Sequence, residues 1–136
     1  QYFVSALKFK NDELDFESDF TYRDKRDSVT CNFSILGPKP FVGFENVKFT
    51  NGQNVVSLSR IKKIFIEKER NNFHSRYTSQ IPLEDFVHLF HFQTIKPVIK
   101  SKGETYEFEI KGKSARARET VESDLISILE LEYNIK

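Results

Sequence analysis

The sequence predicts an α+β domain: a mainly antiparallel β-sheet or barrel with a short internal helix and a C-terminal amphipathic helix. Apolar and polar side chains alternate along much of the first half of the chain, as is typical of strands that bury one face. This period of two gives way to a helical period at Pro82 and again after Ser114. The 136 residues contain no linker, repeat or low-complexity tract, so residues 1–136 are predicted to form a single domain.

The first predicted feature is a β-hairpin. In both Leu14–Tyr22 and Ser28–Ile35, apolar side chains recur at alternate positions and therefore share one face of a strand. The charged run Arg23–Asp27 connects these strands, and Phe3–Lys10 is expected to form another strand before them.

Turn-forming residues divide the middle of the chain. Gly37-Pro-Lys-Pro40 interrupts regular structure, because proline fixes φ and lacks a backbone donor. Asn51-Gly52 is a strong hairpin signal between two alternating segments. Strands are expected over residues 44–50, 54–59, 61–67 and 73–79.

Helical spacing follows Pro82. Leu83, Phe86, Val87 and Phe90 form the apolar stripe of a short amphipathic helix. A second hairpin is expected over residues 98–102 and 105–111, with its turn at Lys102-Gly103-Glu104. The final helix is expected over about residues 114–133, with Ser114 as its N-cap.

Composition limits the classes of protein. The 14 Phe and the 38% apolar content argue against intrinsic disorder. No apolar run reaches the ~20 residues of a membrane-spanning helix. A single cysteine excludes an internal disulfide framework, and five scattered glycines do not form a phosphate-binding loop.

Three histidines are candidate metal ligands. His88 and His91 are three residues apart on the predicted helix, Glu84 lies one turn before His88, and His74 could add a third imidazole. The order does not match the His-Glu-x-x-His pattern, and no nearby cysteine completes a site. We interpret the histidines as the solvated edge of an amphipathic helix, and we predict no metal and no cofactor.

Catalytic groups are also not apparent. Cys31 alternates with Val29 and Phe33 on the inward face, where a thiol is buried and inert. The carboxylates of Asp15, Glu17 and Asp19 share the polar face of one strand, which is typical of a solvated face. The sequence therefore predicts that the protein is not an enzyme.

Charge is unevenly distributed, although the net charge is only +1. Residues 11–27 hold seven acids and three bases, whereas residues 96–118 hold seven bases and three acids. These bases could bind an anion such as a phosphoinositide or a nucleic acid, or could simply keep a sheet edge soluble. The candidate anion-binding residues are Arg23, Lys25, Arg26, Lys96, Lys100, Lys102, Lys111, Lys113, Arg116 and Arg118.

Two segments resemble pleckstrin-homology and GRAM-type barrels. Residues 54–66 (NVVSLSRIKKIFI) are similar to a barrel strand that ends in an Ile-rich turn, and residues 97–110 (PVIKSKGETYEFEI) are similar to the last hairpin. The resemblance implies a barrel that is plugged by the helix over residues 114–133. It implies protein binding rather than lipid binding, because the loop Arg23–Asp27 offsets three bases with two acids.

These observations predict a non-catalytic interaction module that binds a protein or peptide through a strand edge, a helix groove or a loop surface. The alternatives are an anion-binding module for phosphoinositide or nucleic acid, and an exported domain with a carbohydrate or envelope ligand. The chain contains no Met and begins at Gln1, so a removed leader or a longer parent protein is expected. An intracellular location follows if the domain is PH-like, and export follows if a leader precedes Gln1.

Overall fold

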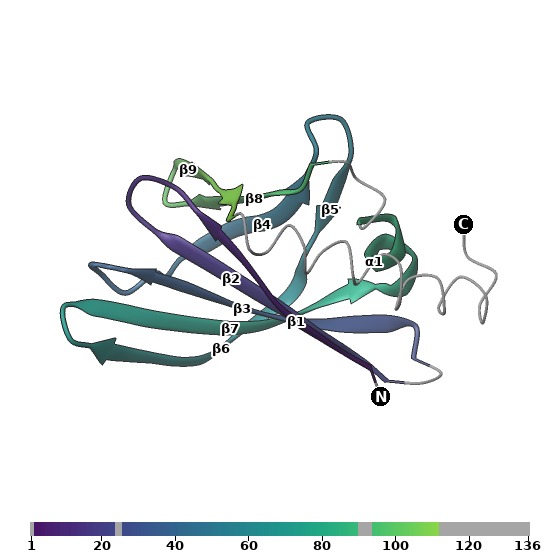
Figure 1. Cartoon of the computed structure of the whole chain (residues 1–136), viewed down its shortest axis with the longest axis horizontal. Helices are drawn as coiled ribbons and strands as arrows, with labels where there is room; N and C mark the ends of the chain where they lie inside the picture. Colours follow the sequence, from purple (N-terminus) through teal and green to yellow (C-terminus); the bar gives the residue numbers. More distant parts are fainter. Residues whose placement is uncertain (1, 24–25, 90–93, 112–136) are drawn as a thin grey trace.

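A computed structural model describes residues 2–23, 26–89 and 94–111, which form two antiparallel sheets and one short helix (Figure 1). The predicted predominance of antiparallel strands with a short internal helix is confirmed. The elements are β1 (Tyr2–Lys10), β2 (Asp15–Tyr22), β3 (Ser28–Gly37), β4 (Phe44–Thr50), β5 (Val55–Ser57), β6 (Ser59–Glu69), β7 (Asn72–Pro82), α1 (Leu83–Leu89), β8 (Lys96–Ser101), β9 (Glu104–Glu107) and β10 (Glu109–Ile110).

The larger sheet has six strands in the order β10-β1-β2-β3-β7-β6. The predicted hairpin of β2 and β3 is confirmed, with Phe16 opposite Ile35 and Phe20 opposite Cys31. Strand β3 also pairs along its whole length with β7, so that Cys31 lies opposite Ser79. This long-range pairing places β3 at the centre of the sheet.

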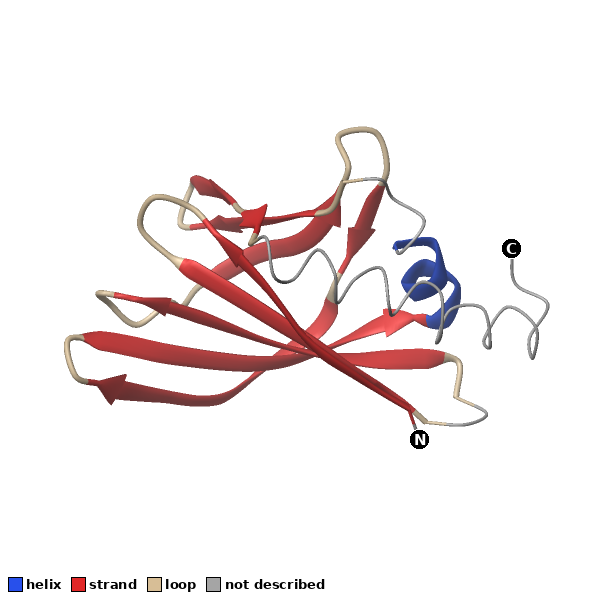
Figure 2. Ribbon diagram, in the orientation of Figure 1, coloured by secondary structure: helices blue, strands red, loops and turns tan. Residues whose placement is uncertain are grey.

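The smaller sheet has four strands in the order β5-β4-β8-β9 and lies across one face of the larger one (Figure 2). The hairpin around Asn51 is confirmed. Its loop is closed by the Asn51 side chain, whose Oδ1 accepts hydrogen bonds from the backbone N–H groups of Gln53 (2.9 Å) and Asn54 (2.7 Å).

Phenylalanine side chains join the two sheets. Phe16 on β2 is fully buried and its ring contacts Phe33 on β3 at a centroid distance of 5.5 Å. It also contacts Phe49 on β4 at 6.2 Å and Phe108, between β9 and β10, at 5.4 Å. The alternating apolar residues of the sequence therefore form one core between the sheets.

The second arm of the last hairpin, predicted over residues 105–111, is not one continuous strand. The chain leaves β9 at Phe108, whose N–H donates to the carbonyl of Pro97 at 3.1 Å, and β10 then pairs with β1 in the larger sheet. Burying the Phe108 ring between the sheets accounts for this break.

The boundaries near the helices also differ in part from the prediction. Pro82 ends β7 rather than beginning the helix, and α1 spans seven residues. None of the described helices has the length and apolarity needed to cross a membrane. The helix predicted over residues 114–133 lies outside the described residues. Within the described residues the two sheets remain separate, and their strands do not close into a barrel.

Candidate functional site

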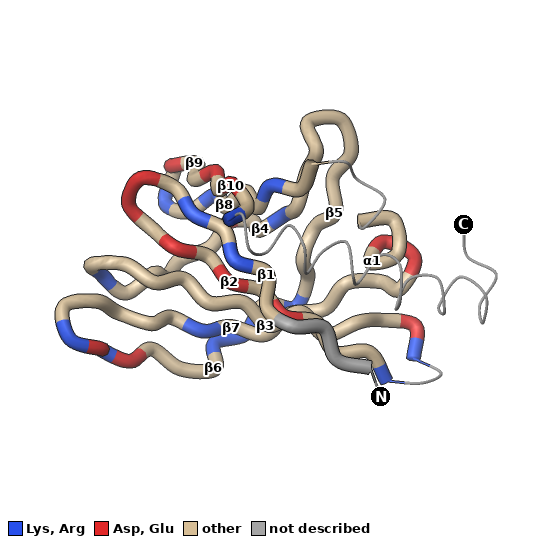
Figure 3. Tube along the Cα trace, viewed as in Figure 1, with Lys and Arg blue, Asp and Glu red and all other residues tan. Residues whose placement is uncertain are grey.

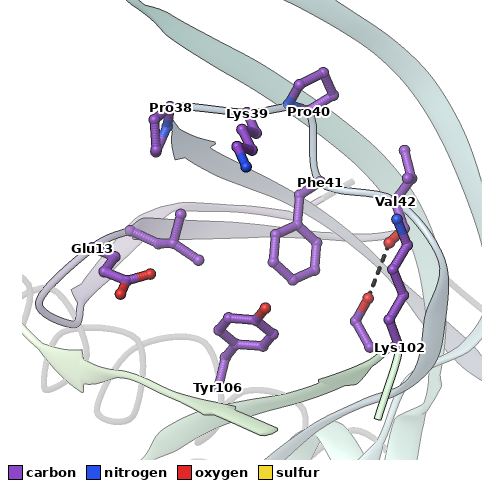
Figure 4. A pocket seen from close by; sticks show the side chains of 10 residues that line it. Glu13, Pro38, Lys39, Pro40, Phe41, Val42, Lys102 and Tyr106 are labelled. Carbon is purple, nitrogen blue, oxygen red and sulfur yellow. Dashed lines mark hydrogen bonds between the residues drawn. The ribbon is translucent and has the colours of Figure 1, made fainter. Parts of the chain in front are cut away.

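A cavity of about 300 Å³ opens where three connections meet at one end of the two sheets (Figure 4). These connections are the β1–β2 turn, the segment between β3 and β4, and the β8–β9 turn. The lining residues are Glu13, Leu14, Pro38, Lys39, Pro40, Phe41, Val42, Ser101, Lys102 and Tyr106. This volume is at the lower end of the range for ligand pockets.

The β3–β4 segment contributes half of this lining, and its backbone is fixed by side chains from neighbouring strands. The N–H of Phe41 donates to Ser75 Oγ at 3.0 Å, and the hydroxyl of Tyr77 donates to the Phe41 carbonyl. From the other sheet, Ser101 Oγ lies 3.0 Å from the carbonyl of Val42. The two prolines on either side of Lys39 restrict φ further. The segment is therefore a loop with a constrained backbone.

Two aromatic rings form the apolar wall of the cavity. The rings of Phe41 and Tyr106 meet edge to face at a centroid distance of 5.2 Å, and both side chains are half-buried. Behind them, Phe44 contacts Phe41 at 5.4 Å and links the wall to the core. Rigid, partly exposed rings of this kind provide large contact areas at a low entropic cost.

The Tyr106 hydroxyl has a defined partner. It donates a hydrogen bond of 2.8 Å to the Glu104 carboxylate. This hydrogen bond is the main cause that raises the pKa of Tyr106, and the negative charges of Glu104 and Glu13 act in the same direction. The hydroxyl is therefore a neutral donor at physiological pH.

Charges of both signs surround these rings. Lys39 and Lys102 are exposed, and neither forms an ion pair with any described residue. Glu13, on the β1–β2 turn, lies across the cavity from Lys102 in Figure 4. A ligand in the cavity would thus meet an apolar wall, two ammonium groups and a carboxylate.

Three of the four described members of the predicted basic cluster form ion pairs. Lys111 Nζ lies 3.0 Å from Asp15, Lys100 Nζ lies 3.6 Å from Glu45, and Lys96 Nζ lies 3.7 Å from Glu109. Because most of these partners are far away in the sequence, counting charges along the chain did not reveal them. Of the described members of the cluster, Lys102 alone lines the cavity.

The second predicted basic group lies elsewhere. Arg23 and Arg26 are exposed in the β2–β3 connection, at the opposite end of β2 from the cavity (Figure 3). The eight residues of β2 separate the two places by roughly 26 Å. Lys25, Lys113, Arg116 and Arg118 lie outside the described residues. The structure therefore does not bring the two described basic groups together.

The histidines are likewise apart. His88 is exposed on α1, whereas His74 lies on β7, and the strand that separates His74 from Pro82 is roughly 26 Å long. His91 lies outside the described residues. The described part of the chain holds no group of three His, Cys, Asp or Glu side chains placed to share a metal ion.

His74 instead belongs to a polar network on the outer face of the larger sheet. Its Nε2 lies 2.7 Å from Ser34 Oγ and its Nδ1 lies 3.6 Å from Glu69. Arg76 donates to the same Ser34 oxygen at 2.9 Å and to Asp19 at 2.9 Å. The order Ser-His-Glu matches the connectivity of a catalytic triad. However, Ser34 has no exposed surface, so a substrate carbonyl cannot reach its hydroxyl, and we interpret the network as structural.

The remaining sequence candidates are explained by the fold. Cys31 is fully buried, as predicted, and burial raises the pKa of its thiol well above the ordinary value. The three acids of β2 each have a basic partner: Asp15 has Lys111, Asp19 has Arg76, and Glu17 lies 4.0 Å from Lys8. This pairing indicates a structural role for all three.

Sequence reasoning named Lys102 as a candidate binding residue but missed the rest of the cavity. The signal that could have found it is Pro38-Lys-Pro-Phe41, in which an aromatic residue follows two prolines in an interrupted segment. Comparisons of the chain with family models, with curated proteins and with solved structures found no match. The geometry alone therefore carries the argument about function.

Proposed function

We propose that this protein is a non-catalytic binding module that holds a peptide segment of a partner protein in the cavity lined by Phe41 and Tyr106. One observation carries the proposal: a backbone-fixed loop presents a half-buried ring and an unpaired lysine at the open end of two sheets. Binding residues commonly lie on loops that a rigid scaffold positions.

The chemistry of the lining supports binding rather than catalysis. The ten lining residues include no His and no Cys, and the Tyr106 hydroxyl is already engaged by Glu104. The Ser101 hydroxyl is buried and lies 3.0 Å from the carbonyls of Val42 and Gly43, which hold it away from a substrate. A nucleophile with an adjacent base, which covalent catalysis requires, is therefore not found among them.

An anion-binding role has weaker support. Lys39 and Lys102 would attract a phosphate or a nucleic acid, but Glu13 in the same cavity would repel it. A peptide that carries both signs of charge beside an apolar side chain can satisfy all three groups. The resemblance to pleckstrin-homology and GRAM-type barrels stays a prediction, and it too implies protein binding.

The test begins with peptides selected from a random display library on the immobilised chain. Their binding sites are then mapped by changes in the ¹H–¹⁵N spectrum. We expect the largest changes in residues 38–42 and 101–106. Tyr106→Ala should weaken binding about 30-fold, as expected for an aromatic hot spot. Phe73→Ala, which removes another half-buried ring outside the cavity, is the matched control. Selected peptides that bind equally well to Tyr106→Ala would contradict the proposal.

A further inference from the structure

Strand β6 forms one edge of the six-stranded sheet. It is 11 residues long and pairs with β7 along one side. On its other side no strand of the described part of the chain lies beside it. An edge of this kind offers backbone N–H and C=O groups to an additional strand.

The first half of this edge is basic without local compensation. Arg60, Lys62 and Lys63 are all exposed, and none of them forms an ion pair with a described residue. Across the ladder, Lys62 lies opposite Thr78 and Lys63 lies opposite Tyr77, so the neighbouring strand contributes no acid at these positions. The positive charge of this half is therefore available to a partner.

The second half of β6 differs in charge. Glu67 and Glu69 accompany Lys68 there, and Glu69 lies 3.6 Å from His74 Nδ1. An acidic partner is thus attracted to the first half of the strand and repelled by the carboxylates of the second half. This asymmetry gives the edge a preferred position for a partner strand.

An apolar contact is present at the same place. Ile64, next to Lys63, is 47% exposed and is one of the few large apolar side chains at the surface of the described residues. The pairing of β6 with β7 is regular at Lys62 and Lys63, between two irregular steps. Lysines on an edge discourage neutral or basic strands from adding to it, but they do not repel an acidic strand.

We propose that the first half of β6 docks an extended acidic segment of a partner protein as an additional strand. Backbone hydrogen bonds would bind the segment, Arg60, Lys62 and Lys63 would select its acids, and Ile64 would contact an apolar side chain between them. A second copy of this chain is a poorer occupant, because a two-fold pairing centred on this half sets lysine beside lysine. None of the residues that line the cavity lies on β6, so this inference does not depend on the proposed function.

The probe is a synthetic peptide of four Glu-Val repeats with blocked ends, and a peptide of four Lys-Val repeats is its counterpart. Binding to the ¹⁵N-labelled chain of 136 residues is followed by chemical shifts and by amide hydrogen exchange. We expect the Glu-Val peptide to protect amides of β6, with an affinity that falls as salt is raised, and the Lys-Val peptide to have no effect.

Charge reversals locate the site on the strand. Lys62 and Lys63 pair with adjacent residues of β7 and therefore point to opposite faces of the sheet, so an alternating peptide can place its Glu side chains beside either one. The double variant Lys62→Glu/Lys63→Glu, which removes both partners, should weaken Glu-Val binding by about threefold to tenfold. Lys68→Glu, which changes the same charge on the second half of β6, should weaken it less than twofold. All three positions are exposed, so each variant is expected to fold, which a circular dichroism melt checks.

Four results would overturn the proposal. The first is Glu-Val binding that the double variant Lys62→Glu/Lys63→Glu leaves unchanged, and the second is protection confined to the edges at β5, β9 or β10. The third is no binding of the Glu-Val peptide at millimolar concentration. A dimer in sedimentation that Lys62→Glu dissociates would identify a second copy as the occupant and would also overturn it.

Discussion

Replacing Lys102 by Asn should make the protein more stable and its cavity a weaker binding site. Lys102 has φ of +52° and Gly103 has φ of +80°, with Ser101 paired to Glu104 across them. These angles are typical of a type I′ hairpin turn, for which Asn-Gly is the preferred sequence. Lysine is therefore an unfavourable residue at this position of the turn.

The magnitude follows from two opposing terms. A left-handed conformation costs a residue with a Cβ atom about 1–2 kcal/mol, and Asn tolerates it better because its short side chain can form local hydrogen bonds. Relieving about half of this cost contributes ~0.5–1 kcal/mol. Against this, the stem of Lys102 lies close to Gly43, and its loss removes a contact that we set at a few tenths of a kcal/mol. The free energy of unfolding should rise by about 0.5 kcal/mol, or about 2 °C in Tm.

Urea unfolding followed by circular dichroism measures the first effect, and titration with a peptide selected on the cavity measures the second. Binding should weaken by up to about fivefold as one exposed charge is lost. Lys10→Asn, at an exposed strand position, is the control, and it should lower stability slightly because Asn is a poor strand former. A Lys102→Asn variant that is less stable than the parent would refute the assignment of strain to this turn. Unchanged peptide affinity would refute the role of Lys102 in binding.

Three other expectations concern the core. Ser18 Oγ is buried without a hydrogen-bond partner among the described residues, so Ser18→Ala should raise the free energy of unfolding by about 1 kcal/mol in urea titrations. A lower free energy of unfolding in this variant would contradict the absence of a hydrogen-bond partner for the Ser18 hydroxyl. Phe16→Ala should cost about 3–5 kcal/mol in the same assay, because its ring joins both sheets, and a cost below 1 kcal/mol would contradict that packing. Burial raises the pKa of Cys31 and that of Tyr77, so the free energy of unfolding should be highest below the unfolded thiol pKa of about 8.5 and should fall as the pH rises above it. The fall should be shallower in Cys31→Val. A free energy of unfolding that stays constant up to pH 10 in the parent would contradict this expectation.

The strands of the larger sheet could be predicted because their inner faces are almost purely apolar. Val29, Cys31 and Phe33 alternate with polar residues, and each is fully buried. Alternation identifies a strand and its buried face, and charged or Asn-Gly connections mark the hairpins. The exception on β2 is Ser18, which has an inward position but which hydropathy alone would not place inside.

The pairing of distant charges could not be predicted in the same way. Lys111 meets Asp15 because β10 pairs with β1, which in turn pairs with β2. Alternation along the chain does not encode the order of strands in a sheet, so a run of bases in the sequence looked more cationic than it is. The local composition therefore overstated the positive charge that is free to bind an anion.

The cavity escaped prediction for a related reason. Three hydroxyl groups fix its loop, and they belong to Ser75 and Tyr77 on β7 and to Ser101 on β8. In the sequence these residues are ordinary members of alternating strands, and nothing there marks their hydrogen bonds to a segment more than 30 residues away. Only the packing of the sheets shows that the loop is held.

Such a loop gives Phe41 a different role from the other rings of the molecule. A fully buried ring such as Phe16 has exchanged all its contact with water for contact with the core, so it has nothing left to offer a ligand. Phe41 keeps one side exposed to the cavity, while its backbone is fixed by two hydrogen bonds to β7. A ligand that covers this side removes apolar surface from water without the cost of ordering the loop. Partial burial on a fixed backbone therefore favours binding at this ring over an aromatic residue on an unconstrained loop.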